Sequence, residues 1–562
     1  MTIKSRIKNI ISEATGEEVE FTVEKPEISD YGDYATNIAL ILAKKQKKEP
    51  IQIAEEIKAK IKSDLFEKIE VVKPGFINFF LNAEILQKKL DSILKEDDDF
   101  GKQDIGKSKT VIVDYSSPNI AKPMHVGHLR PTFIGQAIYN LYKFLGYKVI
   151  GDNHIGDWGT QFGIMIAGLK KYGWNLAKLK NITIAEMLGV YIKFNDEINE
   201  NPDLQEMAKM EFKKLEQNDD KNRKIWKILR DKSLEEFGKI YTILGIKFDL
   251  IKGESDYEEG LGYEIENALK KNLAIKNEDG SIIIPLGEMT PFLIQKSDGA
   301  TVYGTRDLAT IRYRVEKYNP EKIIYVIGNE QSFYLEQLFR CAELLKYISR
   351  DKLYHVKFGL ILGENHKKLS TREGRVVDAG ELINKIIDLA EQTIKEKNPK
   401  LSEKERNEIA KKIGIGALKY NDLSQNRKTD ILFDWKKMLG FEGNSAPYLM
   451  YTYVRLQSIL RKSDFKNKFN PQKLENEKEM EILKEIVKFP EVVEYSAENF
   501  QINNLSDYLF GLANRINNFY ESCPVLKSEK EIKLARLALI KAATIVLKNG
   551  LNLLGIETVE KM

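Results

Sequence analysis

The stretch TVIVDYSSPNIAKPMHVGHLRPTFIGQAIYNLYKFLGYKVI, residues 110–150, carries the pattern that decides the fold. Its β-branched start at 110–115 is typical of a buried strand, and a polar loop then leads to an amphipathic segment that begins near His125. A strand pattern returns at residue 148 with KVIGDNHIGDWG. Strand, helix and strand in this order predict a parallel α/β domain.

Further elements are predicted on both sides of this unit. A charged, helical insertion is expected at about 165–250, and the chain from about 400 to its end is almost wholly helical in pattern. The acidic, glycine-spaced residues 94–109 predict a solvated linker. The remaining expected elements are a helix at 37–48 and buried strands at 75–81, 323–328 and 357–363.

The composition bounds the class of protein. The chain has 562 residues, of which 42% are hydrophobic and 31% charged, which suits several globular domains. Its formal net charge is +4, so any nucleic-acid-binding surface has to be local. The two cysteines, Cys341 and Cys523, form no CxxC motif, which argues against a cysteine zinc site and a disulfide framework. Because the sequence has no signal h-region and no long apolar window, we expect a cytoplasmic protein that makes no membrane contact.

Two motifs in this part of the chain are candidates for binding phosphate. GKQDIGKS at 101–108 fits the P-loop pattern, but an acidic linker precedes it and a strand follows it. Lys107 would then have no helix N-terminus behind it, which argues against a P-loop. HVGH at 125–128 instead follows a strand and opens a helix, at the strand end where α/β sheets bind ligands.

The spacing within HVGH suits a nucleotide. His125 and His128 are three residues apart, so both imidazoles lie on one helix face and can donate N–H groups to phosphate oxygens. Gly127 has no Cβ, so a flat base could approach the backbone closely. By itself, HxGH is also compatible with two helix-facing histidines that bind no ligand.

Longer motifs extend these observations to a known family. SSPNIAKPMHVGHLRPTFIGQ (116–136), GDNHIGDWGTQFG (151–163) and GENHKKLSTREGRVV (363–377) resemble the class I aminoacyl-tRNA synthetases, and specifically the arginyl-tRNA synthetases. HVGH stands in the place of that class's HIGH signature, and KKLSTR in the place of KMSKS. The resemblance covers essentially the whole chain, in the order of the family. Its further motifs lie at 29–39, 73–80, 297–314, 323–339 and 441–455.

The resemblance implies a fold of α/β and α class with three domains. A Rossmann-like, parallel-sheet catalytic domain is expected at 101–395, with the helical insertion inside it. An N-terminal α+β domain at 1–100 is expected to contact the tRNA elbow, and an all-helical anticodon-binding domain is expected at 396–562.

The resemblance also implies an activity. It is the ATP-dependent ligation of L-arginine to the 3′ end of tRNA(Arg) through arginyl-adenylate, which releases AMP and pyrophosphate during protein synthesis. Mg²⁺ enters with ATP as substrate, no zinc or organic cofactor is expected, and the family suggests a monomer. Another class I synthetase, or a non-catalytic tRNA-binding paralogue, stays an alternative.

The same resemblance assigns residues to ATP. The expected ATP-binding and catalytic residues are Lys122, His125, Gly127, His128, Lys368, Leu369 and Ser370. Thr371 stands where KMSKS has its second lysine, which removes a cation from the pyrophosphate side. Lys122, just before HVGH, is expected to supply that cation.

The substrate itself predicts an acidic pocket. A guanidinium has five fixed N–H donors and accepts nothing, so its pocket should contain carboxylates and other acceptors. The candidates are Glu254, Tyr303, Asp307 and Gln331, with Asn119 and His154 for the α-amino and carboxylate groups. An ion pair with Arg306 or Arg312 is the alternative role for Asp307. Tyr334 stands where the family commonly has histidine, and its role stays open.

The helical region offers contacts for tRNA. Anticodon bases are single-stranded and stack on aromatic rings. The expected tRNA contacts are Tyr448, Tyr451, Arg455, Tyr520 and the terminal Met562, with Asn37 in the N-terminal domain. Aromatic residues at this helical spacing are often part of a core, which is the alternative.

Overall fold

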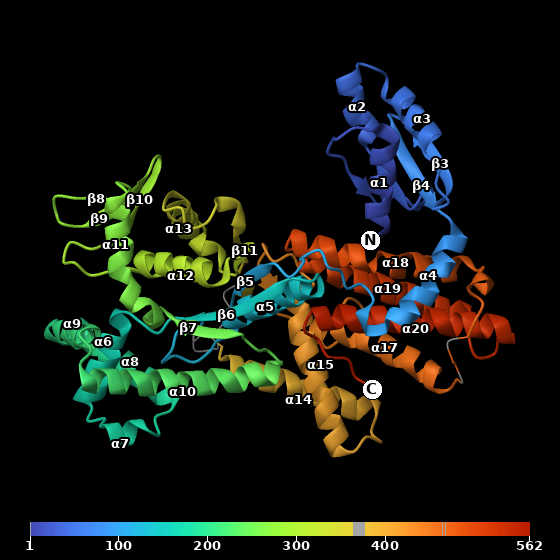
Figure 1. Cartoon of the computed structure of the whole chain (residues 1–562). Coiled ribbons are helices and arrows are strands. Elements are labelled where there is room, and N and C mark those ends of the chain that lie inside the picture. Colours follow the sequence, from blue (N-terminus) through green and yellow to red (C-terminus); the bar gives the residue numbers. More distant parts are fainter. Residues whose placement is uncertain (1, 364–376, 464, 467) are drawn as a thin grey trace. The chain divides into compact units, whose positions relative to one another are not determined.

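The computed structural model describes residues 2–363, 377–463, 465–466 and 468–562. The chain forms two compact units, one of residues Asp104–Leu439 and one that combines the segment up to Gln103 with Gly440–Met562 (Figure 1). The Asp104–Leu439 unit contains HVGH and all the residues expected to bind arginine.

A five-stranded parallel sheet forms the centre of the Asp104–Leu439 unit (Figure 1). Its strand order is β12-β11-β5-β6-β7, and every pairing is parallel, which confirms the predicted α/β domain. Val111, Ile112 and Val113 are fully buried, as expected for a strand covered on both faces. The strands are β5 Thr110–Asp114, β6 Lys148–Ile155, β7 Leu250–Gly253, β11 Lys322–Tyr325 and β12 Leu353–His355.

The chain connections diverge at β5. Helix α5 (Val126–Phe144) leads from β5 to β6 on one side, whereas β11 pairs with β5 on the other side. Open α/β sheets bind ligands at the carboxyl end of the strand where such a divergence occurs. HVGH lies after this end of β5. GKQDIGKS opens no helix, because Lys107 and Ser108 lead directly into β5.

Helices fill the connection between β6 and β7, as predicted. They are α6 Thr160–Lys171, α7 Leu176–Leu179, α8 Ile184–Glu200, α9 Asp203–Glu216 and α10 Asp220–Leu244. After β7, the 3₁₀ segment η3 and helix α11 lead to a small antiparallel sheet, and two helices then flank β11 in sequence. These elements are η3 Glu254–Gly260, α11 Leu261–Lys270, β8 Ile275–Lys276, β9 Ile282–Leu286, β10 Met289–Gln295, α12 Tyr303–Tyr318 and α13 Ser332–Leu344.

The prediction of a core strand at 357–363 is wrong. Only Ile361–Leu362 forms a strand, β13, and it pairs with β14 (Ile431–Leu432) outside the main sheet. The edge of the main sheet is β12, just upstream. The backbone of this segment is bound elsewhere, since the N–H of Gly359 donates to the carbonyl of Arg427 at 3.0 Å.

The second unit contains an N-terminal antiparallel sheet and a group of helices. The sheet order is β1-β2-β4-β3, and strand β4 confirms the strand predicted at 75–81. Its strands are β1 Val23–Glu24, β2 Tyr34–Thr36, β3 Phe66–Val72 and β4 Phe76–Leu81. The helices are α1 Ile3–Thr15, α2 Ile38–Gln46, α3 Pro50–Lys60 and α4 Ala83–Glu96, followed after Gly440 by α17 Ala446–Arg461, α18 Glu477–Glu498, α19 Ile502–Ser522 and α20 Lys530–Leu553.

The predicted solvated linker at 94–109 is wrong in part. Helix α4 continues to Glu96, and the carboxylate of Asp98 accepts hydrogen bonds from Lys548 at 2.7 and 2.9 Å. The side-chain amide of Asn549 donates to the carbonyl oxygens of Asp98 and Phe100, both at 3.1 Å. The acidic run therefore binds to helix α20, although its side chains stay largely exposed.

Candidate active site

His125 and His128 lie together at the start of α5. His125 is the N-cap residue, and its Nδ1 accepts the backbone N–H of Gly127 at 3.1 Å. The Nδ1 of His128 accepts the backbone N–H of His125, also at 3.1 Å, and the two ring centroids are 3.9 Å apart. A neutral imidazole whose Nδ1 accepts a hydrogen bond carries its proton on Nε2. Both histidines therefore present an Nε2–H donor.

Burial keeps these imidazoles neutral. Desolvation lowers the pKa of His128 to about 3, helped by the neighbouring ring of His125. Desolvation also lowers the pKa of His125, opposed by the charge of Asp378 and helped by that of Lys122. A Cβ at Gly127 would lie 2.9 Å from Cε1 of His125, so glycine leaves room for the capping ring. At neutral pH the pair supplies hydrogen-bond donors and no net charge.

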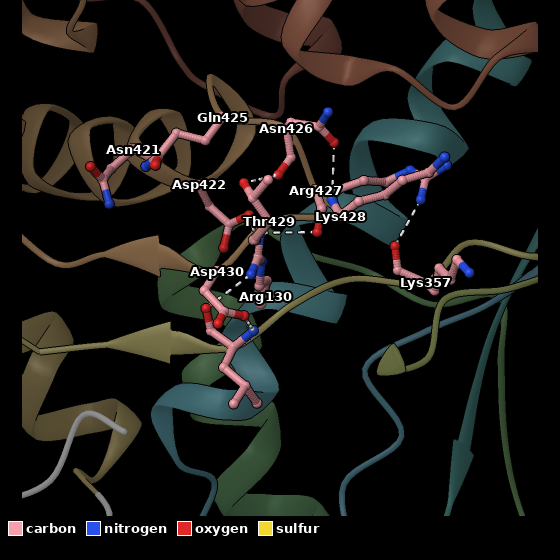
Figure 2. Close-up of polar contacts among 11 residues, drawn as sticks. Arg130, Lys357, Asn421, Asp422, Gln425, Asn426, Arg427, Lys428, Thr429 and Asp430 are labelled. Atoms are coloured by element: carbon pink, nitrogen blue, oxygen red, sulfur yellow. Dashed lines mark hydrogen bonds and ion pairs between the residues drawn. The ribbon is translucent and has the colours of Figure 1, made fainter. Parts of the chain in front are cut away.

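A buried arginine anchors the helix that carries the pair (Figure 2). Arg130 on α5 donates to the carbonyl oxygen of Leu360 at 3.1 Å. It also donates to the carbonyl oxygens of Arg427 and Thr429, at 3.1 and 2.9 Å. Its Nε lies 3.5 Å from Oδ1 of Asp422, in the last turn of α15 (Glu403–Leu423). The sequence contained a signal for this anchor, a charged residue within an apolar helical run, but did not indicate its partners.

Backbone contacts also fix the first turn of α5. The N–H of Val126 donates to the carbonyl oxygen of Val377 at 3.0 Å. His125 forms an isolated antiparallel bridge with Asp378. Since the rest of α5 is held by Arg130, the two imidazoles are fixed from both directions along the helix.

Two carboxylates without a cationic partner lie close enough to influence each other. Burial raises the pKa of Glu254 to about 8, and the negative charge of Asp307 contributes to this shift. Burial also raises the pKa of Asp307. Among the described residues neither carboxylate forms an ion pair, and the buried Oε2 of Glu254 accepts no hydrogen bond. Buried acids are costly without a partner, so this arrangement is suited to a cationic ligand.

The alternative ion pair between Asp307 and a neighbouring arginine does not form. Arg306 instead binds Glu258, with Nε 3.1 Å from Oε1. Arg312 binds Glu264, with Nε 2.6 Å from Oε1. Arg306 and Arg312 are therefore already paired, and neither forms an ion pair with Asp307.

Asp307 has a different partner. The hydroxyl of Tyr334 on α13 donates to Oδ2 of Asp307, a contact that the sequence did not reveal. The ring of Tyr334 packs against Phe292 of β10, with centroids 5.8 Å apart. Tyr303, the first residue of α12, is exposed. Partial desolvation, followed by the negative charge of Glu254, raises the pKa of its hydroxyl. Tyr303 and Asp307 are four apart on one helix, as predicted.

His154 and Asn119 lie at the carboxyl ends of neighbouring strands. Both ring nitrogens of His154, on β6, are buried, and within the described part of the chain they have no hydrogen-bond partner. Asn119 follows β5 and forms an isolated bridge with Gly156. A Cβ at Gly156 would lie 1.9 Å from Oδ1 of Asn119, so only glycine allows this approach. The two residues expected to bind the amino-acid end of arginine therefore lie at the same edge of the sheet.

A buried ion network connects α12 to this edge. Arg314 on α12 binds Asp114 of β5 at 2.6 Å and Asp152 of β6 at 2.8 Å. The attraction of these two carboxylates raises the pKa of Arg314, against its desolvation. The network was not predicted; it fixes the position of α12, and hence of Asp307, against β5 and β6.

The remaining residues expected at the site are placed as follows. Lys122 lies before HVGH, with Nζ 4.8 Å from the ring centroid of Tyr191, and its charge helps to lower the pKa of His125. Gln331 ends the 3₁₀ segment Asn329–Gln331 and is exposed. Lys368, Leu369 and Ser370 lie outside the described residues.

Helices α17 and α19 bring together three of the residues expected to bind tRNA. The guanidinium carbon of Arg455 lies 5.1 Å from the ring centroid of Tyr451 and 4.6 Å from that of Tyr520. The two rings are 41% and 42% exposed, so they are not part of a core. Tyr448 is half-buried, and its hydroxyl donates to Oδ1 of Asn514 at 2.6 Å.

Two further residues expected to bind tRNA lie apart from this cluster in the sequence. Oδ1 of Asn37 accepts the N–H of Thr22 at 3.0 Å, beside a 360 Å³ cavity that Lys4 and Lys8 also line. Met562 is half-buried at the end of the chain.

Several further findings concern metals, membranes and thiols. No three His, Cys, Asp or Glu side chains among the described residues are grouped so as to hold a metal ion. In the part of the chain that the structure describes, no helix is long and apolar enough to cross a bilayer. Cys341 and Cys523 are buried free thiols.

Comparisons with known proteins match the chain from end to end. The family model described as tRNA synthetases class I (R), catalytic domain, matches residues 89–435. The models described as Arginyl tRNA synthetase N terminal domain and DALR anticodon binding domain match residues 1–81 and 449–562.

Named relatives and solved structures agree with these models. The arginine–tRNA ligase of Fusobacterium nucleatum is 40% identical over 567 residues, covering 100% of this chain and 98% of the relative. That of Clostridium kluyveri is 43% identical over 552 residues, covering 97% and 96%. The crystal structure of arginyl-tRNA synthetase from Plasmodium falciparum matches with a TM-score of 0.86 and 28% identity over 100% of both chains. Arginyl-tRNA synthetase from Thermus thermophilus has the same fold, with a TM-score of 0.85 at 23% identity over 100% of both chains.

Proposed function

The chain belongs to the arginyl-tRNA synthetase family and ligates arginine to tRNA, and from this premise we propose a role for each residue of the site. The observation that carries the proposal is the pair of carboxylates, Glu254 and Asp307, that has no cationic side chain bound to it in the described structure. A guanidinium is always charged and offers N–H donors in fixed directions, so it can satisfy both acids at once. A lysine ammonium is a point charge and cannot reproduce this fit, which accounts for discrimination against it.

The amino-acid end of arginine is held by the sheet edge in this proposal. His154 and Asn119 bind the α-carboxylate and α-amino groups, and the ring nitrogens of His154 have no hydrogen-bond partner among the described residues. Tyr303 and Gln331 complete the contacts to the substrate side chain. Binding at both ends directs the carboxylate of arginine toward the triphosphate, which lowers the entropy cost of the reaction.

The histidine pair acts on ATP. A carboxylate oxygen of arginine attacks the α-phosphorus, a P–O bond forms, and the bond to pyrophosphate breaks. Negative charge then increases on the phosphate oxygens, and the Nε2–H groups of His125 and His128 donate to them. Lys122, together with Lys368, Leu369 and Ser370 of the second signature, supplies further contacts to ATP. Mg²⁺ accompanies ATP as part of the substrate.

The second step transfers arginine to tRNA. The ribose hydroxyl at the 3′ end of tRNA(Arg) attacks the arginyl carbonyl, and AMP leaves. Tyr448, Tyr451, Arg455, Tyr520 and Met562 contact the anticodon region, whereas Asn37 belongs to a domain that contacts the tRNA elbow. We propose domains at 1–100, 101–395 and 396–562, and an enzyme that acts as a cytoplasmic monomer.

Pyrophosphate exchange tests the assignment. Purified full-length protein is incubated with ATP, labelled pyrophosphate and one amino acid at a time, with and without tRNA. We expect exchange with arginine alone, and only in the presence of tRNA, as the family resemblance implies. Exchange with lysine or an apolar amino acid would reassign the pocket. Tight tRNA binding without any exchange would instead identify a non-catalytic paralogue.

A further inference from the structure

Tyr334 occupies a position between two of the elements that form the arginine pocket. It belongs to the first turn of α13, and its hydroxyl donates to Oδ2 of Asp307 on α12. Its ring packs against Phe292 of β10, which lies directly beneath the start of α12, since a Cβ at Gly304 would meet the Phe292 ring at 2.5 Å. Three elements therefore determine where the hydroxyl of Tyr334 points.

The chemistry of this contact differs from that of an ion pair. Burial, followed by the negative charge of Asp307, raises the pKa of Tyr334 well above its usual value. The phenol therefore stays protonated and donates at every physiological pH. It stabilises the ionised form of Asp307 without placing a second positive charge beside a guanidinium.

The hydrogen bond also restricts the orientation of the carboxylate. With Oδ2 bound to Tyr334, Asp307 cannot rotate freely about its terminal torsion, and Oδ1 remains as the acceptor for a ligand. An acceptor fixed in direction distinguishes a planar guanidinium from a flexible ammonium. We propose that Tyr334 is a positioning residue for arginine specificity, which acts by orienting the carboxylate of Asp307. This inference rests on the proposed role of Asp307 in binding the guanidinium.

Other ionisable side chains face the same carboxylate. His154 on β6 and Arg314 on α12 favour ionised Asp307, whereas Asp114 on β5 opposes it. Glu254 in η3, when ionised, also acts on Tyr334 and raises its pKa further. These groups are unchanged when the hydroxyl of Tyr334 is removed, so a shift in pH dependence can be assigned to that hydroxyl.

The test is steady-state aminoacylation by the full-length Tyr334→Phe variant. We expect KM for arginine to rise about tenfold, equivalent to about 1.4 kcal/mol, while kcat and KM for ATP stay within about twofold. The pH profile of KM for arginine should move to higher pH, because Asp307 loses a donor that favours its ionised form. A purely structural role would not move that profile.

Two further variants make the result decisive. Phe292→Leu disturbs the packing of the Tyr334 ring but retains its hydroxyl, and should leave the pH profile unchanged. Asp307→Asn removes the charge on which the inference depends. If Asp307→Asn raises KM for arginine and Tyr334→Phe does not, this inference is wrong and the proposed function stands. If Asp307→Asn itself leaves KM for arginine unchanged, the proposed function fails first. Equal effects of Tyr334→Phe and Phe292→Leu on KM, with identical pH profiles, would also overturn the inference.

Discussion

The proposed arginine pocket and the Tyr451–Arg455–Tyr520 cluster use charge in opposite ways. In the pocket, Glu254 and Asp307 are acids with no cationic side chain bound to them in the described structure. In the cluster, the guanidinium of Arg455 already lies against two aromatic rings and donates a hydrogen bond to Oδ1 of Asn517 at 3.2 Å. The charged group of the cluster is thus bound by other side chains of the protein, whereas the acids of the pocket have no such cationic partner among the described residues.

This difference predicts how sensitive each region is to mutation. A desolvated polar group that is paired only by its correct ligand discriminates strongly against other ligands, because binding one of them leaves the group buried and unpaired. An exposed ring gains about 1–3 kcal/mol per stacked base and tolerates variation in the base. We therefore expect large, arginine-specific losses in the pocket and small, tRNA-specific losses in the cluster.

The largest effect is expected for Asp307→Asn. The amide keeps an acceptor for Tyr334 but removes the negative charge, so kcat/KM for arginine should fall about 1,000-fold, or about 4 kcal/mol. KM for tRNA should stay within about twofold. Glu316→Gln is the matched control, since it removes an exposed carboxylate from the same helix that is paired with Arg312. A loss of less than about tenfold at Asp307 would mean that the pocket does not depend on its charge.

A smaller loss is expected for Lys122→Ala. Because Thr371 replaces the second lysine of the usual signature, Lys122 should supply that cation, and its removal should slow arginine-dependent pyrophosphate exchange about 100-fold. Binding of tRNA should be nearly unchanged. Lys193→Ala is the control. It removes a lysine of the helical insertion that lies over the ring of Tyr172, and it should change neither pyrophosphate exchange nor tRNA binding. Equal loss of exchange and of tRNA binding would contradict the role of Lys122.

The sequence predicted the helices and strands near the proposed arginine pocket. It did not predict which segments pack against them. Strands β5 and β6 follow from β-branched runs, and the start of α5 follows from the amphipathic pattern that begins near His125, and both signals act within a few positions of the chain. The segment 357–363 has an equally apolar pattern, but Arg130 and the loop that carries Arg427 bind its backbone instead of the sheet. Which partner a strand finds is a tertiary property that a local pattern does not contain.

The same distinction holds within the site. Resemblance to the family indicated Glu254 and Asp307, and the structure adds the groups that hold them. Tyr334 is 27 residues from Asp307, and Arg314 is 162 residues from Asp152. The periodicity of the sequence detects neither of these two contacts. Buried charges and their unpartnered atoms become visible only when these remote segments are packed together.

The pH dependence of arginine binding sharpens the comparison. Since the pKa of Glu254 is about 8 in the free enzyme and a guanidinium binds the ionised acid, KM for arginine should rise about tenfold as pH falls from 9 to 7. The Glu254→Gln variant should lose this dependence. KM for tRNA should show no such trend in either protein, since the Tyr451–Arg455–Tyr520 cluster contains no carboxylate.

The same group affects stability. Between the ordinary pKa of 4.5 and about 8, the folded state keeps a proton on Glu254 that the unfolded state has lost. The unfolded state then binds fewer protons, so the free energy of unfolding falls as pH rises through this window. Thermal unfolding of wild type and Glu254→Gln across this range measures the contribution. An identical slope in both proteins would mean that Glu254 is ionised in the free enzyme.

The smallest effect is expected in the cluster, for Tyr451→Leu. The ring is 41% exposed and Tyr520 still covers Arg455, so KM for tRNA should rise only about fivefold, or about 1 kcal/mol. KM for arginine should not change. Tyr495→Leu is the matched control, because Tyr495 is exposed to the same 41% on α18 and lies outside the cluster. Stacking on a base predicts an unchanged salt dependence of KM, whereas a contact to phosphate would reduce the salt slope by about one. If Tyr495→Leu raises KM for tRNA as much as Tyr451→Leu does, the effect belongs to exposed tyrosines in general, and the cluster is not a base-stacking surface.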